Sequence, residues 1–347
     1  MKTEIERIGC LEGSTGIERA VSLLKSGCVV GIPTETVYGL CANALDDGAV
    51  RMVYKAKKRP HDNPLVVHVL DRAMAEAVWD LARISPENRE KLERLIEAFC
   101  PGGLTFVVPK RDGFSDTVTC GQNTVCVRFP SGEIFREVLR QSQLPIAAPS
   151  ANVSGRPSGT TAGDVYADLC GEIPLVLDGG ECVFGVESTI LSLVGEHPTI
   201  LRKGAVTKES IERIVGCVMD GGDEAVYCPG LRYRHYAPAK PVLLIEGEDC
   251  REVCRKIEEI ASKEGRISLL CTDDIWGILD EKERIVYRSV GKDRTCFEEI
   301  GQSLFRAIRV LEKECANVIV SVGVSDVGLG SALMDRMRRG STEIIRV

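Results

Sequence analysis

Short apolar runs typical of strands recur along the first two hundred residues, and stretches with the spacing of amphipathic helices separate them. The runs predict strands at 28–32, 65–70, 104–109, 124–129, 144–148, 174–178, 188–194 and 199–202. The intervening periodicity predicts helices at 16–25, 72–83, 86–99, 133–141 and 208–216. Alternating strands and helices indicate an α/β domain, and the varied connections favour a mixed sheet over a purely parallel one.

The periodic pattern fails between residues 219 and 240, where Gly and Pro interrupt the chain. A passive tether would be rich in Gly, Ser and Pro, whereas this segment also contains Tyr233, His235 and Tyr236. The pattern then resumes, with predicted strands at 241–246, 267–271 and 317–322 and predicted helices at 249–264, 296–314 and 330–339. We therefore expect a first domain of residues 1–218, a linker of residues 219–240 and a smaller α/β domain of residues 241–347.

The composition excludes several classes of protein. With 44% hydrophobic and 27% charged residues, the 347-residue chain is neither disordered nor fibrous. The net charge of −7 argues against nucleic-acid binding through a general basic surface. The fifteen cysteines are scattered without a CxxC pair, which predicts buried thiols and no structural metal. No apolar run reaches the roughly 20 residues of a membrane helix and the first residues include acids, so we expect a cytoplasmic protein without a membrane partner.

Four cationic residues precede Pro60, namely Lys55, Lys57, Lys58 and Arg59. Such a run, stopped by a proline and followed by a predicted strand, is a locally fixed positive site that suits a phosphate group. A solvated helix end gives the same pattern, because cations near a helix C-terminus interact favourably with the helix dipole. The sequence leaves both interpretations open.

Two polar loops follow predicted strands, where ligands bind in α/β sheets. The segment GIPTETVYGL at 31–40 exposes two threonines, a glutamate and a tyrosine, and its alternative interpretation is a polar turn that caps the next helix. The segment PIAAPSANVSGRPS at 145–158 places Ser150, Asn152 and Ser158 in a loop of small residues. Small side chains let backbone N–H groups approach a ligand closely, although Ser, Pro and Gly also make ordinary loops.

The strand at 124–129 carries a charged residue on a face of small side chains. The two-residue period of a strand places Thr124, Cys126 and Arg128 on one face. A guanidinium there requires an anion, which is either a ligand or, in the commoner case, an internal Asp or Glu. His68, isolated on its own strand, is more typical of a satisfied core residue than of a ligand.

Common catalytic signatures do not occur in the sequence. The four histidines do not combine with a Ser or Cys in the order of a hydrolytic triad, GxxxxGK[ST] is missing, and no GxGxxG follows the first strand. The polar segments share a capacity to bind phosphates and a carboxylate. We therefore expect a reaction that depends on positioning and charge stabilisation rather than on a side-chain nucleophile.

Six blocks of sequence together resemble the YrdC-like family, and the additional C-terminal domain resembles its long, two-domain form. The blocks are PTETVYGL at 33–40, KKR at 57–59 followed by DNPL, SAN at 150–152, GVEST at 185–189, LRKG at 201–204 and HYAP at 235–238. The resemblance implies an α/β fold in which a YrdC-like twisted mixed sheet with helices and a large cavity is followed by a linker and a smaller Rossmann-like domain.

The resemblance implies an enzyme that converts L-threonine, bicarbonate and ATP into threonylcarbamoyl-AMP and pyrophosphate. This is the first stage in making threonylcarbamoyladenosine at position 37 of tRNAs. It also implies that Mg²⁺ arrives with ATP, that no metal is held by the protein alone, and that the HYAP segment folds over the cavity. The product would be handed to the tRNA threonylcarbamoyl transferase machinery, and a weak contact with tRNA is left open.

The resemblance also assigns roles to individual residues. The catalytic residues it implies are Lys57 and Arg59. The implied ATP-binding residues are Lys57, Arg59, Asn63, Thr124, Ser150, Asn152, Ser158, Arg202 and Tyr236. The implied threonine-binding residues are Thr36, His68, Arg128, Ala148 and Ser188.

Two other functions are compatible with domains of this kind. The chain could act as an RNA-binding or ribosome-associated module, but its negative net charge and the lack of aromatic residues at 55–59 argue against this. A carbamoyl-adenylate step in hydrogenase maturation is the other, and the chain lacks the acylphosphatase and the Cys-rich zinc segments that accompany it.

Overall fold

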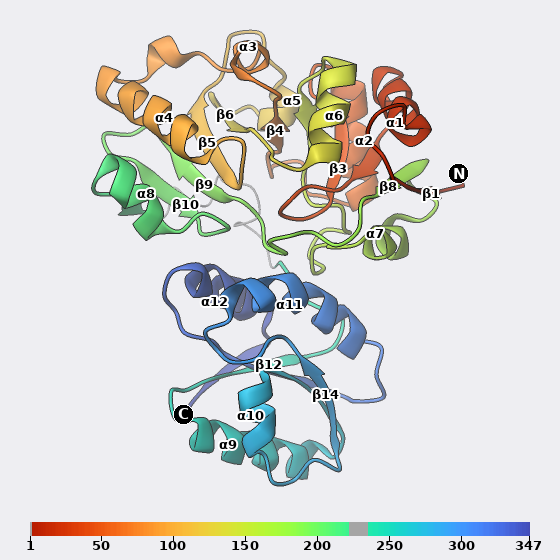
Figure 1. Cartoon of the computed structure of the whole chain (residues 1–347), viewed down its shortest axis with the longest axis vertical. Coiled ribbons are helices and arrows are strands. Elements are labelled where there is room, and N and C mark those ends of the chain that lie inside the picture. Colours follow the sequence, from red (N-terminus) through yellow and green to blue (C-terminus); the bar gives the residue numbers. More distant parts are fainter. Residues whose placement is uncertain (1, 222–234) are drawn as a thin grey trace. The chain divides into compact units, whose positions relative to one another are not determined.

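The computed structural model describes residues 2–221 and 235–347, which form two compact units (Figure 1). The first unit contains residues 2–154, 159–183 and 187–221. The second contains residues 155–158, 184–186 and 235–347, so two short segments that precede the linker in the sequence belong to it. Most of the predicted linker, including Tyr233, lies outside the described residues.

One mixed sheet forms the centre of the first unit. As far as the chain is described, its strands are β1 (Glu4–Arg7), β2 (Val30–Ile32), β3 (Gly39–Asn43), β4 (Val66–His68), β5 (Leu104–Pro109), β6 (Thr124–Arg128), β7 (Ile146–Ala147), β8 (Leu175–Asp178), β9 (Thr189–Ser192), β10 (Thr199–Arg202) and β11 (Met219–Asp220). Their order is β1-β8-β2-β3-β7-β4-β6-β5-β9-β10-β11. Parallel pairs such as β4 with β6 occur beside antiparallel pairs such as β5 with β6, so the predicted mixed sheet is confirmed.

Helices cover both faces of this sheet (Figure 1). They are α1 (Thr15–Lys25), α2 (Asp47–Lys57), α3 (Arg72–Ala75), α4 (Pro86–Phe99), α5 (Asp116–Thr119), α6 (Glu133–Ser142), α7 (Ala162–Leu169) and α8 (Lys208–Val215), with a 3₁₀ turn at Leu81–Arg83. Cys41 of β3 packs in one core cluster with α1 and α6, whereas Leu40 and Ala42 belong to a larger cluster with α2 and α4. The alternation follows because successive side chains of a strand point to opposite faces.

The single helix predicted at 72–83 is wrong. Helix α3 ends at Ala75, and Trp79 forms an antiparallel bridge just beyond the end of β5. The N–H of Asp80 donates to the last carbonyl oxygen of β5 at 2.9 Å, and the Asp80 side chain caps the separate turn at Leu81–Arg83. Pairing with a neighbouring strand therefore overrides the local helical pattern. Strand β1 is also not predicted, because its sequence EIER contains one apolar residue and gives no alternation.

The second unit is a parallel sheet with helices on both faces. Its strands are β12 (Val242–Glu246), β13 (Ile267–Cys271), β14 (Ile285–Ser289), β15 (Ile319–Val322) and β16 (Glu343–Arg346), in the order β14-β13-β15-β12-β16. Helices α9 (Cys250–Glu264) and α10 (Asp273–Ile278) cover one face, and α11 (Phe297–Leu311) and α12 (Leu329–Gly340) the other (Figure 1). The predicted fold class is confirmed, although β14 and β16 are not predicted. None of the helices in the described ranges is long and apolar enough to cross a bilayer.

Candidate active site

Three neighbouring strands place a row of polar side chains on one face of the mixed sheet. His68 of β4 pairs with Arg128 of β6, which in turn pairs with Thr105 of β5. The residues that alternate with this row point to the other face of the sheet and belong to the main core. The face of the row itself carries a small apolar cluster of Val66, Val107, Cys126 and Ile190. The predicted face of Arg128 is confirmed, and the sheet presents its guanidinium beside a histidine.

Arg128 is buried and contacts three groups. Its Nη2 lies 2.8 Å from Oε1 of Glu35. Its Nη1 donates to Oγ1 of Thr36 at 2.9 Å, and its Nε donates to the carbonyl oxygen of Gly102 at 3.2 Å. The contact with Glu35 is an ion pair without the alignment of a hydrogen bond. The internal acid that the sequence leaves open as the partner of Arg128 is therefore Glu35.

Glu35 lies in the loop between β2 and β3, and backbone groups also bind its carboxylate. The N–H of Ser131 donates to Oε1 at 3.0 Å and the N–H of Gly132 to Oε2 at 3.2 Å. Burial alone would raise the pKa of this carboxyl, but the charge of Arg128 and the Ser131 N–H lower it to about 2. Glu35 is therefore ionised at neutral pH and is too weak a base for general base catalysis.

His68 is 3% exposed, and its ring lies 5.0 Å from that of Phe135 between centroids. Burial and the nearby charge of Arg128 lower its pKa to about 3, so the imidazole is neutral near pH 7. Within the described residues, its Nδ1 has no hydrogen-bond partner. Because buried polar atoms nearly always have a partner, the expectation of a satisfied core histidine is wrong for this nitrogen. His68 offers a neutral nitrogen to a ligand.

The loop between β2 and β3 is buried rather than exposed. Thr34, Glu35, Thr36 and Tyr38 are each at most 6% exposed. Oγ1 of Thr34 lies 2.8 Å from Oγ1 of Thr36. The latter oxygen accepts the hydrogen bond from Nη1 of Arg128. The chain continues into β3 and not into a helix, so both the predicted exposure and the alternative of a helix cap are wrong. The threonine hydroxyls instead face the polar row of the sheet.

The cationic run at 55–59 divides into exposed and buried residues. Helix α2 ends at Lys57, and Lys58 adopts the left-handed conformation with a φ of 51°. Lys55 and Lys58 are exposed, whereas Lys57 and Arg59 are buried. The exposed pair fits a solvated helix end, and the buried pair forms a fixed positive site, for which a phosphate ligand stays a prediction.

Carbonyl oxygens hold the two buried cations in place. Nζ of Lys57 donates to the carbonyl oxygens of Ser150 and Asn152, the latter at 2.5 Å. Nε of Arg59 donates to the carbonyl oxygen of Asn63 at 3.0 Å, and its Nη2 donates to Oδ1 of Asn63 at 2.6 Å. The structure therefore brings Lys57 to the predicted loop around 150–152 and joins Arg59 to Asn63.

Ser188 and Arg202 extend the polar row toward β9 and β10. Nη2 of Arg202 donates to the carbonyl oxygen of Ser188 at 2.9 Å and to its Oγ at 3.2 Å. Oγ of Ser188 lies 2.8 Å from Oγ1 of Thr105, a member of the row. Ala148 follows β7, and its N–H donates to the carbonyl oxygen of Val66 in β4 at 2.9 Å. The residues predicted to bind threonine thus lie on adjoining elements.

The remaining predicted nucleotide residues are Thr124, Ser158 and Tyr236. Thr124 starts β6, at the opposite end of that strand from Arg128 and about 13 Å away by the rise of a strand. Ser158 and Tyr236 belong to the second unit. There the Tyr236 ring stacks on Phe305, with 5.3 Å between ring centroids.

Glu35 and Thr105 are not among the site residues predicted from the sequence. Thr105 is the one polar residue in LTFVVP of β5, and a lone hydroxyl in a buried strand is a signal because it needs a partner. That partner, Ser188, is 83 residues away, so the local pattern does not identify it. Glu35 gives a weaker signal, because any acid in a polar loop has the same appearance.

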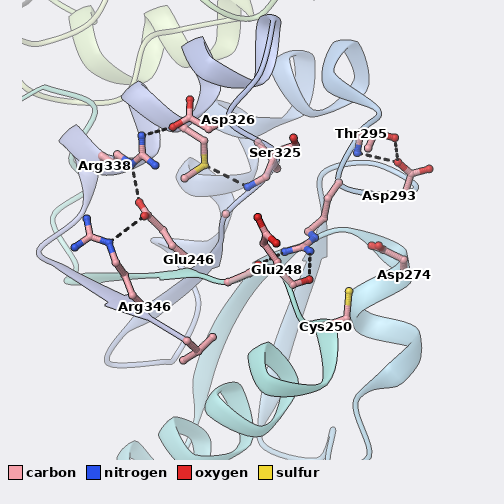
Figure 2. Close-up of a pocket in the computed structure, with 16 residues that line it drawn as sticks. Glu246, Glu248, Cys250, Asp274, Asp293, Thr295, Ser325, Asp326, Arg338 and Arg346 are labelled. Atoms are coloured by element: carbon pink, nitrogen blue, oxygen red, sulfur yellow. Dashed lines mark hydrogen bonds and ion pairs between the residues drawn. The ribbon is translucent and has the colours of Figure 1, made fainter.

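The second unit has its own pocket of about 770 Å³ (Figure 2). It lies beyond the carboxyl ends of β12 and β15, where the chain leaves neighbouring strands toward opposite faces of the sheet. Arg338 donates to Glu246 and Asp326, both at 2.6 Å. None of the residues predicted from the sequence lines this pocket. Among the described residues, no three His, Cys, Asp or Glu side chains gather as a metal site.

Two family models together match nearly the whole chain. Residues 22–204 match the family of Sua5, YciO and YrdC proteins, which carries the description "Telomere recombination". Residues 206–342 match the family described as "Threonylcarbamoyl-AMP synthase, C-terminal domain". The first match alone spans more than half of the sequence.

Individual relatives agree with these models. A threonylcarbamoyl-AMP synthase of Pyrococcus abyssi is 40% identical over 335 residues, which cover 94% of each chain. One of Bacillus subtilis is 39% identical over 331 residues, which cover 94% of this chain and 92% of the relative. The crystal structure of P. abyssi Sua5 complexed with L-threonine has a TM-score of 0.88 and 37% identity over the full length of both chains. The chain described here belongs to the family of two-domain threonylcarbamoyl-AMP synthases.

Proposed function

We propose that the protein makes threonylcarbamoyl-AMP and pyrophosphate from L-threonine, bicarbonate and ATP, for the threonylcarbamoyladenosine modification at position 37 of tRNA. Relatives with the corresponding name support this over 94% of the chain. The structural observation that carries it is the row of His68, Arg128 and Thr105. In that row a buried guanidinium lies beside a neutral imidazole whose Nδ1 has no partner in the described chain. Such a pair can bind the carboxylate and the amino or hydroxyl group of an amino acid.

The proposed threonine-binding residues are Thr36, His68, Arg128, Ala148 and Ser188. A guanidinium has five N–H groups, and the described contacts of Arg128 occupy three directions, one at each nitrogen. Arg128 therefore keeps further donors on Nη1 and Nη2 for a carboxylate. The hydroxyls of Thr36 and Ser188 lie at either side of this row and can orient the substrate.

The proposed ATP-binding residues are Lys57, Arg59, Asn63, Thr124, Ser150, Asn152, Ser158, Arg202 and Tyr236, of which Lys57 and Arg59 are also the proposed catalytic residues. Two observations support the catalytic pair: both side chains are buried, and carbonyl oxygens fix their positions. A fixed cation stabilises developing phosphate charge without reorganisation during the reaction. Ser158 and Tyr236 are assigned by resemblance alone.

The reaction requires two new bonds. One joins the threonine nitrogen to the bicarbonate carbon, with loss of water, and the other joins a carboxylate oxygen to the α-phosphorus of ATP, with loss of pyrophosphate. We propose that Lys57 and Arg59 stabilise the charge of the leaving pyrophosphate, together with Mg²⁺ held on the triphosphate. The amine must lose a proton before it attacks, and the low pKa values of Glu35 and His68 make both groups poor bases near neutral pH.

The product is a mixed anhydride, which water hydrolyses. We therefore propose that it is passed in the cytoplasm to the tRNA threonylcarbamoyl transferase machinery. The negative net charge of the chain argues against strong tRNA binding through a general basic surface, and a weak contact with tRNA stays open.

Pyrophosphate release tests the proposed reaction. Release should require ATP, threonine and bicarbonate together, and equal release with glycine, serine or no amino acid would refute the proposal. Lys57→Ala should lower the rate at saturating substrate by at least about a hundredfold, as expected for a group that stabilises transition-state charge. Lys55→Ala, two residues away and exposed on the same helix, is the matched control and should keep the rate of the parent protein.

A further inference from the structure

Glu35 is the carboxylate that faces the guanidinium of the proposed threonine site. Both side chains are nearly inaccessible, with 5% of the Arg128 side chain and 6% of the Glu35 side chain exposed. The N–H groups of Ser131 and Gly132 also bind the carboxylate, one at each oxygen. The backbone N–H of Glu35 itself also lowers the pKa of this carboxyl. The negative charge of Glu35 is therefore held in a fixed position beside Arg128.

The charges of Arg128 and the acid in contact with it cancel. Arg128 contributes one positive charge and Glu35 one negative charge, while His68 is neutral near pH 7. A carboxylate that approached Arg128 alone would also approach Glu35, and the repulsion from Glu35 would offset much of the attraction. A zwitterion differs, because its ammonium group can lie toward Glu35 while its carboxylate lies toward Arg128. The pair is thus complementary to an amino acid and not to a simple acid.

We propose that Glu35 is a specificity-determining residue, which restricts the Arg128 site to ligands that carry an ammonium group beside their carboxylate and excludes the corresponding hydroxy acids. The inference rests on the proposed binding of threonine at Arg128. Glu35 acts by charge and not by proton transfer. It selects the substrate that contains the nitrogen needed for the reaction before that nitrogen loses its proton.

Calorimetry with two ligands tests this on the full chain. The ligands are L-threonine and 3-hydroxybutyrate, which has the same hydroxyl, methyl and carboxylate groups but no amine. We expect the parent protein to bind threonine at least about 100-fold more tightly, since an ammonium within a few ångströms of a buried carboxylate interacts strongly. A ratio of dissociation constants below about threefold in the parent protein would overturn the inference without any variant.

Glu35→Gln removes the charge and keeps the shape of the side chain. We expect the ratio of the two dissociation constants to fall at least about tenfold, because threonine loses its attraction to Glu35 and 3-hydroxybutyrate loses its repulsion. Glu133→Gln is the matched control, because Glu133 is an exposed carboxylate directly after Gly132. An unchanged ratio in Glu35→Gln would overturn the inference, since a merely structural Glu35 would alter stability and not this ratio.

Arg128→Gln separates the inference from the proposed function. If threonine affinity is unchanged in Arg128→Gln, threonine does not bind at Arg128 and the proposed site itself fails. If threonine affinity falls in that variant while the ratio is unchanged in Glu35→Gln, the site stands and only the role of Glu35 is wrong.

Discussion

The two units each contain an arginine held by carboxylates, in very different surroundings. In the first unit, Arg128 contacts Glu35 at 2.8 Å, and 5% of its side chain is exposed. In the second unit, Arg338 donates to Glu246 and Asp326 at 2.6 Å, and 37% of its side chain is exposed (Figure 2). Distance alone would rank the second cluster as the stronger one.

Exposure to water reverses that ranking. Exposed ion pairs gain little because water already solvates both charges, whereas a buried charge that loses its partner has neither water nor a counter-ion. The first cluster also has a nitrogen without a hydrogen-bond partner among the described residues, Nδ1 of its neighbour His68, and its guanidinium is almost wholly shielded from water. The comparison indicates that a ligand gains more from the first site, and four stability measurements can sharpen or break it.

The largest expected effect is an acid sensitivity of the buried site. His68 has a pKa of about 3 in the folded protein, against about 6.5 for an unfolded histidine. Between these pH values the unfolded chain binds one more proton than the folded chain, so the free energy of unfolding falls as the pH falls, by up to about 5 kcal/mol. The pKa of Glu35 is lowered to about 2, so its contribution is present above about pH 4.3 and is lost below. The interval from pH 6.5 to 4.5 therefore reports His68.

Fluorescence can isolate the first unit in this measurement. The chain has two tryptophans, Trp79 in the first unit and Trp276 in the second, so Trp276→Phe leaves a reporter in the first unit. Urea unfolding should show the pH dependence in this background, and His68→Gln should remove about one proton from its slope. An equal slope with and without His68 would show that this histidine does not titrate as the buried site requires.

The next effect concerns the buried ion pair itself. Arg128→Met leaves the Glu35 carboxylate buried without its cation and should lower the free energy of unfolding of the first unit by about 3–5 kcal/mol. The double variant Arg128→Met with Glu35→Gln removes both charges and keeps an acceptor for Ser131. It should recover at least about 2 kcal/mol, because no unpaired charge remains. If Arg128→Met lowers the free energy of unfolding by less than about 1 kcal/mol, this buried ion pair contributes no more to stability than an exposed one.

The sequence predicts the strands of this fold well where the local pattern is sufficient. The predicted strands at 104–109 and 199–202 and the helix at 86–99 have the observed bounds. The helix predicted at 72–83 is wrong because Trp79 and Asp80 pair with the end of a strand that comes 25 to 30 residues later in the sequence. Local periodicity contains no information about that contact.

The candidate site shows the same limit at the level of single residues. Strand alternation correctly places Arg128 on one face with Cys126, and it requires an anionic partner there. It cannot choose between a ligand and an internal acid, because Glu35 enters from a loop more than 90 residues earlier in the chain. The cationic run at 55–59 has a similar ambiguity. The structure shows that Lys57 and Arg59 are buried, and the phosphate expected there stays a prediction.

A smaller effect is expected from the neutral contacts of the row. Thr105→Val removes a hydroxyl whose Oγ1 lies 2.8 Å from Oγ of Ser188, and both residues are buried. We expect a loss of about 1–2 kcal/mol in the unfolding of the first unit, since Ser188 loses one of its partners without access to water. Thr199→Val is the control in the same sheet, because its hydroxyl bond to the carbonyl oxygen of His197 is exposed. A control loss as large as that of Thr105→Val would mean that burial is not the cause.

The smallest effect should come from Arg338, although its contacts with acids are shorter than the contact of Arg128 with Glu35. Arg338→Met removes two hydrogen bonds of 2.6 Å, yet we expect a loss of about 1 kcal/mol or less in the second unit. Water can replace the guanidinium, and Arg346 remains 3.5 Å from Glu246. Trp276 fluorescence in a Trp79→Phe background measures the second unit, and the difference between Arg338→Met and its parent should shrink at 1 M salt, where exposed charges are screened. A loss of 3 kcal/mol that persists in salt would mean that this pocket, like the row around Arg128, isolates its charges from water.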